Sequence, residues 1–396
     1  MTTAPQDVPS DNAGDQPGDA PEAPKKKLSR TARVLLVLGV NLGVLLFTTE
    51  VVLRVLRPAP FAEAELMPTF LKNQQNMRAQ AHPYQAFIPR PNWQSPPESD
   101  KQTSHNRHGF RGPDVAVEKP DDVFRIVCLG GSSTYGHTPT SDATTWPAQL
   151  QRMLNEGQDA KRVQVLNGGF SGYNTFESLA NLSFRMLDFE PDLVIVYHSI
   201  NDARCTLYRG IDGVERDNTH WRAVYPVYMP TPTERLLEKS MTYLIYRRYF
   251  TDYIAGMGDM GQWGIVDFDP DEVNPWVHNK TTQQGFDNFR RNLESIWAVT
   301  STRDIDLVLA SQGCDRTEHS ITKLQARALD ENEKILREVA EDKQLLFVEG
   351  RAALDEAAAR EGKDKIYTHE VHLHDRGAEV LAGAFAEAIL ASGAIR

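Results

Sequence analysis

The chain has 396 residues, 40% hydrophobic and 24% charged, which is enough for one large or two ordinary globular domains and excludes a fibrous or wholly disordered protein. Its formal net charge of -11 argues against a nucleic-acid partner, because phosphate binding requires a basic face. The three cysteines, Cys128, Cys205 and Cys314, are too few and too scattered for a disulfide framework or a zinc site. A single Cys205–Cys314 bridge stays open for an oxidising compartment.

The N-terminal region predicts the compartment. Residues 1–30 combine Asp, Pro, Gly and Ala without periodicity and are predicted to be a disordered cytoplasmic tail. Residues 31–57 are long and apolar enough to form a transmembrane signal anchor across a hydrocarbon core of about 30 Å. Because basic residues are denser before this segment than after it, we expect a single-pass protein of the inner (cytoplasmic) membrane. The N-terminus would lie in the cytoplasm and everything beyond residue 57 on the periplasmic or extracellular side.

Two other interpretations of the apolar segment stay open, a cleaved signal peptide and a buried core helix. Ala62-Glu63-Ala64 would suit a cleavage site, but it lies well past the end of the apolar run, which favours a retained anchor. Residues 58–122 follow as a proline-rich connector that is expected to pack partly on the body. Within it, His105–Gly112 is predicted to be either a structural clasp or part of the rim of a site.

From Phe124 onward, short apolar runs alternate with helical patterns. Strands are predicted at 124–129, 162–166, 193–197, 306–310 and 345–348, and helices at 146–154, 176–187, 286–299, 326–339 and 376–389. This alternation predicts an α/β fold in three layers (α/β/α), with a parallel sheet of about five strands and helices on both faces. The catalytic domain is assigned to residues 123–396, with an insertion at 203–283 that is too long for an ordinary connection.

Polar and glycine-rich loops follow the predicted strands. Gly130-Gly131-Ser132-Ser133 follows the first strand, Asn167–Asn174 the second and His198–Asp202 the third, while Tyr367–Gly377 precedes the last helix. Because the carboxyl ends of parallel strands meet at the edge where open α/β sheets hold their active sites, we expect these loops to converge. Together they supply a hydroxyl nucleophile, a histidine base and hydrogen-bond donors for an oxyanion, which is the set that acyl transfer requires.

With these loops the chain resembles the SGNH (GDSL-type) hydrolase family, named for a Ser, a Gly, an Asn and a His in four sequence blocks. The first block corresponds to Gly130-Gly131-Ser132 and the last to His372, in the family's order and spacing, over roughly residues 105–392. The resemblance implies a flavodoxin-like sheet and an esterase site. It makes Ser132 the nucleophile and His372 the base, with Ser132, Gly172 and Asn201 forming the oxyanion hole.

The chain departs from the family pattern at two positions. Gly131 replaces the usual aspartate of the first block, a variant that leaves the nucleophile in place. His369 stands three residues before His372, where the family usually has the aspartate that orients the histidine. In the serine-protease template, neutralising that aspartate costs about 10⁴ in turnover. Glu370 and His369 are therefore the candidates for a third catalytic member; the alternatives are a dyad oriented by a backbone carbonyl and an impaired enzyme.

These observations predict a serine esterase or acylhydrolase that acts on an ester or acylated-glycan substrate, such as a deacetylase of envelope glycans or small esters. Two alternatives remain, an O-acyltransferase on a cell-envelope polysaccharide and a non-catalytic envelope module with a degenerate site. The insertion at 203–283 is interpreted as a lid packed on the core, or as a sugar-stacking or membrane-facing surface. No cofactor, metal or nucleic acid is expected.

Overall fold

The computed structural model describes residues 29–56, 78–82, 85, 87–156, 162–206, 232–246, 282–317 and 321–395. The chain divides into two units, Met1–Pro58 and Ala59–Arg396. Several predictions lie outside the described residues: the tail over 1–28, the connector over 57–77 with its Ala62-Glu63-Ala64 triplet, and the parts of the insertion over 207–231 and 247–281.

The first unit contains one long apolar helix, α1 (Arg30–Leu56). At a rise of about 1.5 Å per residue, its 27 residues span roughly 40 Å, more than a hydrocarbon core. Its apolar window is 0% buried within this unit, which does not favour the alternative of a buried core helix. A membrane anchor and a signal sequence both meet this description, and the side of the membrane on which the second unit lies stays a prediction.

The second unit is built on a sheet of five parallel strands. These are β3 (Val123–Gly130), β4 (Arg162–Asn167), β5 (Leu193–Tyr197), β6 (Asp306–Ala310) and β7 (Leu346–Val348). Their order across the sheet is β4-β3-β5-β6-β7, so β3, the first strand of this sheet along the chain, lies between the second and the third. The predicted α/β fold with a parallel five-stranded sheet is confirmed.

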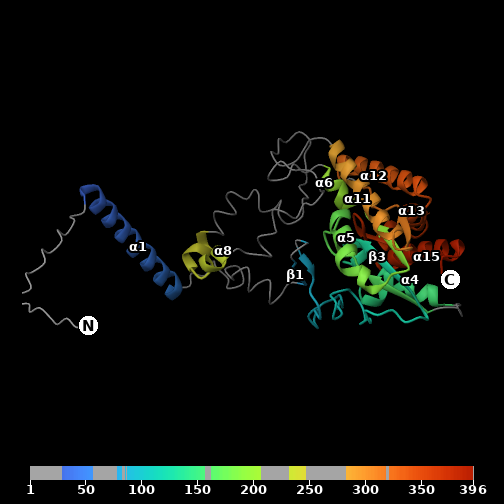
Figure 1. Ribbon diagram of the computed structural model, residues 1–396, viewed down its shortest axis with the longest axis horizontal. Coiled ribbons are helices and arrows are strands. Elements are labelled where there is room, and N and C mark those ends of the chain that lie inside the picture. Colours follow the sequence, from blue (N-terminus) through green and yellow to red (C-terminus); the bar gives the residue numbers. More distant parts are fainter. Residues whose placement is uncertain are drawn as a thin grey trace, which may run out of the picture. The chain divides into compact units, whose positions relative to one another are not determined.

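Helices cover both faces of this sheet (Figure 1). Successive side chains of a strand point to opposite faces, so Val127 and Leu129 enter one apolar core while Ile126 and Cys128 enter the other. The first core is covered by α5 (Thr175–Asn181), α6 (Ile200–Cys205), α11 (Gln283–Ser301) and α12 (Lys323–Asp342). The second is covered by α4 (Trp146–Asn155), α13 (Gly350–Glu361) and α15 (Asp375–Ser392). Short elements complete the unit: β1 (Ala79–Ala81), β2 (Phe87–Pro89), α3 (Ser132–Tyr135), α8 (Pro232–Leu237), α14 (Lys363–Ile366), β8 (Tyr367–His369) and β9 (His372–Leu373).

The closing helix α15 is docked tightly against the sheet. Phe385 stacks on Trp146 of α4 with 4.8 Å between ring centroids, and both side chains are fully buried. At the start of α15, a Cβ on Gly377 would lie 2.3 Å from the carbonyl oxygen of Ile366, so only glycine allows this close approach. The packing fixes the β8–β9 hairpin, which immediately precedes the helix.

Several details differ from the sequence analysis. Helix α13 and the β8–β9 hairpin were not predicted. The helix predicted at 176–187 is α5 followed by a π-helical turn over Leu182–Met186. Cys205 and Cys314 are buried and form no disulfide, so the structure does not contain the bridge left open between them.

Candidate active site

Ser132 and His372 meet at the carboxyl edge of the sheet. Ser132 begins α3, directly after β3, and His372 begins β9. The Nε2 atom of His372 lies 2.7 Å from the Oγ atom of Ser132, although the residues are 240 positions apart in the chain. The neighbouring hydroxyl is used differently, because Ser133 donates to the carbonyl of Val371 at 2.9 Å. The geometry therefore pairs the histidine with Ser132 and not with Ser133.

The hairpin that carries His372 is tied to the loop after Ser132 on both sides of the histidine. Besides the Ser133 bond to Val371, the Thr138 hydroxyl donates to the carbonyl of Leu373 at 2.7 Å. One step further on, the backbone N–H of Thr140 donates to Asp375 at 2.8 Å. Because these contacts hold the backbone around His372, the imidazole is positioned before any substrate binds.

The backbone around Ser132 has no room for larger residues. A Cβ on Gly130 would lie 1.9 Å from the hydroxyl oxygen of Thr134 and 2.9 Å from the carbonyl oxygen of Tyr197. Gly136 ends the short helix α3 in the left-handed conformation, with φ of 83°. Asn167 at the end of β4 donates to the carbonyl of Thr134 at 2.9 Å and supports the turn from the neighbouring strand.

Besides Ser132, the residues predicted for the oxyanion hole lie in the loop after β4 and on α6, and Asn201 approaches Gly131, the residue before Ser132. Gly172 has φ of 81°, a conformation that favours glycine, in the loop after β4. Asn201, on α6 after β5, donates through Nδ2 to the carbonyl of Tyr173 at 2.8 Å. A Cβ added to Gly131 would lie 2.7 Å from the same Nδ2 atom. The Asn201 amide is thus beside the immediate neighbours of Ser132 and Gly172, where a substrate oxyanion would need donors.

This crowding explains the first departure from the family pattern. A side chain at position 131 would collide with the Asn201 amide at 2.7 Å and with the carbonyl oxygen of Tyr173 at 3.0 Å. In this chain the Asn201 amide occupies the space that an aspartate side chain at position 131 would require. Gly131 is therefore part of the placement of Asn201.

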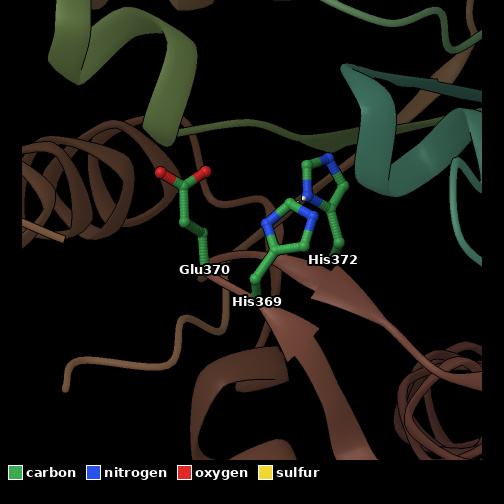
Figure 2. A group of neighbouring side chains, drawn as sticks. All are labelled: His369, Glu370 and His372. Carbon is green, nitrogen blue, oxygen red and sulfur yellow. Dashed lines mark hydrogen bonds between the residues drawn. The ribbon is translucent and has the colours of Figure 1, made fainter. Parts of the chain in front are cut away.

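The second departure places an imidazole where a carboxylate is usual. His369 Nδ1 lies 3.3 Å from His372 Nδ1, on the side of the ring away from Ser132. Figure 2 shows the His369 ring next to the His372 ring, with the Glu370 carboxylate on the other side of His369. Glu370 instead accepts two hydrogen bonds from Nη2 of Arg204, at 3.1 and 2.8 Å. Of the two candidates for a third member, His369 is the one that contacts His372.

The electrostatic surroundings make His372 a weak base. Burial is the main cause that lowers the pKa of His372 from 6.5 to about 2, and electrostatic interactions with His369, His137, Arg204 and Lys101 lower it further. The imidazole is therefore neutral at physiological pH and ready to accept a proton. Because a low pKa also means weak basicity, its power to activate a hydroxyl is small.

Arg204 contacts both Asn201 of the proposed oxyanion hole and Glu370 of the histidine hairpin. Its Nη1 atom donates to Oδ1 of Asn201 at 3.0 Å, while Nη2 binds Glu370. The Arg204 and Glu370 side chains are only 9% and 11% exposed, so the ion pair is largely shielded from solvent. Glu370 adopts φ of 42°, an uncommon conformation for this residue type, which the ion pair helps to hold. The orientation of the Asn201 amide is thereby linked to the histidine hairpin.

His369, Glu370 and His372 are also the described residues that could hold a metal ion, since one ligand atom from each lies within 4.8 Å of the others. The separation of 3.3 Å between the two Nδ1 atoms suits neighbouring ligands of a tetrahedral zinc, for which bonds of about 2.0–2.1 Å give a similar edge. However, Glu370 is held by Arg204, and other positive charges surround the imidazoles. A metal bound here would also occupy the Nδ1 atom of the proposed base.

The connector contributes a structural clasp under the serine loop. His105 bonds through Nε2 to the hydroxyl of Tyr135 on α3 at 2.8 Å. Arg111 pairs with Asp142 at 2.6 Å and donates to the carbonyls of Tyr135 and Gly136. These buried contacts place His105–Gly112 behind the nucleophile, in agreement with the first of its two interpretations.

Two side chains near the pair were absent from the sequence analysis. The ring of His137 lies 5.5 Å from that of His372, and Arg78 donates to Nδ1 of His137 at 3.2 Å. His137 follows the first block by five residues, which was the available signal. Arg78 gave none, because it lies 54 positions before Ser132 in the irregular connector.

His198 and Asp202 form a separate buried network. His198 bonds through Nε2 to the Ser178 hydroxyl at 2.7 Å, and its Nδ1 atom lies 3.9 Å from Asp202. Asp202 accepts hydrogen bonds from the backbone and hydroxyl of Thr175. Burial lowers the pKa of His198 to about 3, and the side chain is 1% exposed, so the network braces the loop and has no access to substrate.

The model of the GDSL-like Lipase/Acylhydrolase family matches residues 128–380, well over half of the chain. The chain belongs to this family. Among solved structures, this GDSL-like protein is similar to Axe2, an acetylxylan esterase from Geobacillus stearothermophilus, with 16% identity, a TM-score of 0.42 and coverage of 67% of this chain and 94% of the other. It is also similar to LAE5, an alpha/beta hydrolase enzyme from the metagenome of Lake Arreo, Spain, with 17% identity, a TM-score of 0.41 and coverage of 69% and 96%. The comparison with curated protein sequences gave no match.

Proposed function

We propose that this family member is a serine esterase, a carboxylic ester hydrolase in which Ser132 is the nucleophile and His372 the base. The observation that carries the proposal is the distance of 2.7 Å between Ser132 Oγ and His372 Nε2. This is hydrogen-bonding range for transfer of the hydroxyl proton. Membership of an acylhydrolase family supports the same reaction class.

The proposed reaction starts with attack of Ser132 Oγ on the ester carbonyl carbon while Nε2 of His372 accepts the hydroxyl proton. The oxyanion of the tetrahedral intermediate receives hydrogen bonds from the backbone N–H groups of Ser132 and Gly172 and from Nδ2 of Asn201. Collapse breaks the bond to the alcohol, which leaves with the proton from His372. A water molecule, deprotonated by the same imidazole, then attacks the acyl carbon; the bond to Ser132 Oγ breaks, His372 returns the proton to Oγ, and the acid leaves.

His369 takes the place of the orienting carboxylate in this proposal. With Nδ1 of His372 protonated, Nδ1 of His369 accepts its hydrogen at 3.3 Å and keeps Nε2 free to act as the base. An imidazole in this position orients the ring but stabilises the imidazolium less than a carboxylate does. We therefore expect a slow enzyme whose base is correctly oriented.

We further propose that residues 1–30 are a cytoplasmic tail, α1 is a retained anchor, and the catalytic domain at 123–396 acts on the periplasmic or extracellular side. The helix length and the basic residues Arg30 and Arg33 at its N-terminal end support this orientation. An ester or acylated glycan of the cell envelope would be within reach of a domain tethered in this way.

The test is hydrolysis of a short-chain aryl ester by the purified chain and three variants. Ser132→Ala and His372→Ala are expected to lose measurable turnover while their circular dichroism spectra stay unchanged. Ser133→Ala is the matched control: it removes a neighbouring hydroxyl that bonds only the hairpin backbone, and it is expected to retain turnover. Loss of activity in Ser133→Ala with retention in Ser132→Ala would refute the assignment.

A further inference from the structure

Unbalanced positive charge lies beside the proposed catalytic pair, although the whole chain carries a net charge of -11. Two nearby cations are neutralised, since Arg111 pairs with Asp142 and Arg204 pairs with Glu370. Arg78 and Lys101 differ: within the part of the chain that the structure describes, neither pairs with a carboxylate.

Arg78 is held in a fixed position. Its Nη2 atom donates to Ser171 Oγ at 3.1 Å and to Nδ1 of His137 at 3.2 Å. Its guanidinium group lies over the ring of Tyr135, 5.3 Å from the centroid. Ser171 precedes Gly172 of the proposed oxyanion hole, and His137 packs against His372. The cation is thus preorganised between the two loops that flank the reacting atoms.

His137 itself adds no charge to this cluster. Burial, together with the positive charges of Arg78 and Lys101, lowers its pKa to about 4, so the ring is neutral near pH 7 and accepts the hydrogen from Arg78. Lys101 contributes to lowering the pKa of both His137 and His372, so its charge lies near both rings. Neither Arg78 nor Lys101 pairs with a carboxylate of the described residues, so both side chains are available to bind an anionic ligand.

Building on the esterase function proposed above, we propose that the substrate is an ester whose alcohol part carries a carboxylate or a phosphate that binds Arg78 and Lys101. The anion is assigned to the alcohol part because His372 returns the proton to the leaving alcohol. His137 packs beside the His372 ring, and Arg78 in turn contacts His137. The anion of the substrate supplies near His372 the negative charge that His369 cannot. Neutral esters lack this contribution and react more slowly.

The test compares matched esters that differ in one charge. The pair is meta-acetoxybenzoate and its methyl ester, with meta-acetoxyphenyl phosphate as the phosphate arm. We expect kcat/KM at low salt to be at least about tenfold higher for the anionic esters, and the preference to shrink in about 0.5 M salt. Arg78→Gln and Lys101→Gln are expected to lower this ratio, and the double variant to bring it near one. Arg152→Gln on α4, which removes a cation paired with Glu156, is the control and is expected to keep the ratio.

A second measurement separates this inference from the esterase function. Equilibrium binding to Ser132→Ala requires no turnover, and we expect meta-acetoxybenzoate to bind at least about tenfold more tightly than its methyl ester. Tighter binding without hydrolysis by the wild type would support the anion site and refute the esterase. Hydrolysis without preference, or a preference that survives the Arg78→Gln/Lys101→Gln double variant, would overturn the anion site alone. A preference confined to an anion on the acyl side, tested with para-nitrophenyl succinate and its methyl ester, would overturn its placement.

Discussion

Replacing His369 by aspartate is predicted to make the enzyme faster. Oδ1 of aspartate and Nδ1 of histidine are both bonded to Cγ, so the substitution puts a carboxylate oxygen where an imidazole nitrogen now stands. That position is 3.3 Å from Nδ1 of His372, within range of a charge-assisted hydrogen bond. The variant thus restores the usual family residue without moving the hairpin.

The size of the effect follows from the charge that is introduced. Opposite unit charges about 4 Å apart attract by about 4 kcal/mol at the effective dielectric constant near a protein surface. This raises the pKa of His372 by about three, from the present value of about 2. Because a stronger base activates the serine more effectively, kcat/KM at about pH 8 is expected to increase at least about tenfold.

The pH profile gives an independent readout. Activity requires neutral His372, so it is present above the pKa of that group and lost below it. With its low pKa, wild-type His372 produces no acid limb between about pH 5 and pH 8, while His369→Asp gains one near about pH 5.

The matched control is His369→Asn, which has the same shape as aspartate and no charge. It is expected to lack both the rate increase and the acid limb, measured as kcat/KM for an aryl acetate across the pH range. Equal rates for the aspartate and asparagine variants would refute the claim that the missing charge limits this site.

Three further predictions concern the geometry, the imidazole pair and the core. Gly131→Ala is expected to displace the Asn201 amide, against which the new Cβ would lie at 2.7 Å, and to lower kcat about 100-fold with KM little changed; an unchanged kcat would contradict the oxyanion role. Excess Zn²⁺ is expected to inhibit by binding the Nδ1 atoms of His369 and His372, reversibly with chelator, and inhibition that persists in His369→Ala would place the metal elsewhere. Phe385→Ala, which removes a fully buried ring from the α15 interface, is expected to lower the free energy of unfolding by about 3–5 kcal/mol, and a loss below about 1 kcal/mol in urea denaturation would contradict that packing.

The sheet was predictable from sequence because its strands carry their own signal. Buried parallel strands appear as short continuous apolar runs, and the range predicted for the third strand, 193–197, agrees with β5 (Leu193–Tyr197). The proximity of Ser132 and His372 was predicted because loops at the carboxyl ends of parallel strands meet at one edge of the sheet, and because the family resemblance pairs these two residues. The order of strands then brings the loops after β3 and β5 together at the point where the chain reverses its direction across the sheet.

Helix α13 and the β8–β9 hairpin carry weaker signals. Only Gly350, Leu354 and Ala357 of α13 are buried, so the helix shows little apolar periodicity. The hairpin strands have three and two residues, which is too short for an alternating pattern to be recognised. Docking of α15 and contacts with the serine loop hold the hairpin in place.

The surroundings of the base depended on contacts between distant parts of the chain. Glu370 was a candidate partner of His372, but its carboxylate binds Arg204, 166 positions earlier in the sequence. The approach of Arg78 to His137 likewise joins the connector to the first catalytic loop. No local pattern encodes such pairings, since they arise from the packing of whole elements.

The pairing of Ser132 with His372 can be tested by labelling with a fluorophosphonate, which modifies activated serines. The modified peptide is then mapped. We expect one label per chain, on Ser132, and labelling at least about 100-fold slower in His372→Ala. A label on Ser133, or no label on a folded chain, would contradict the proposal that Ser132 and His372 act together.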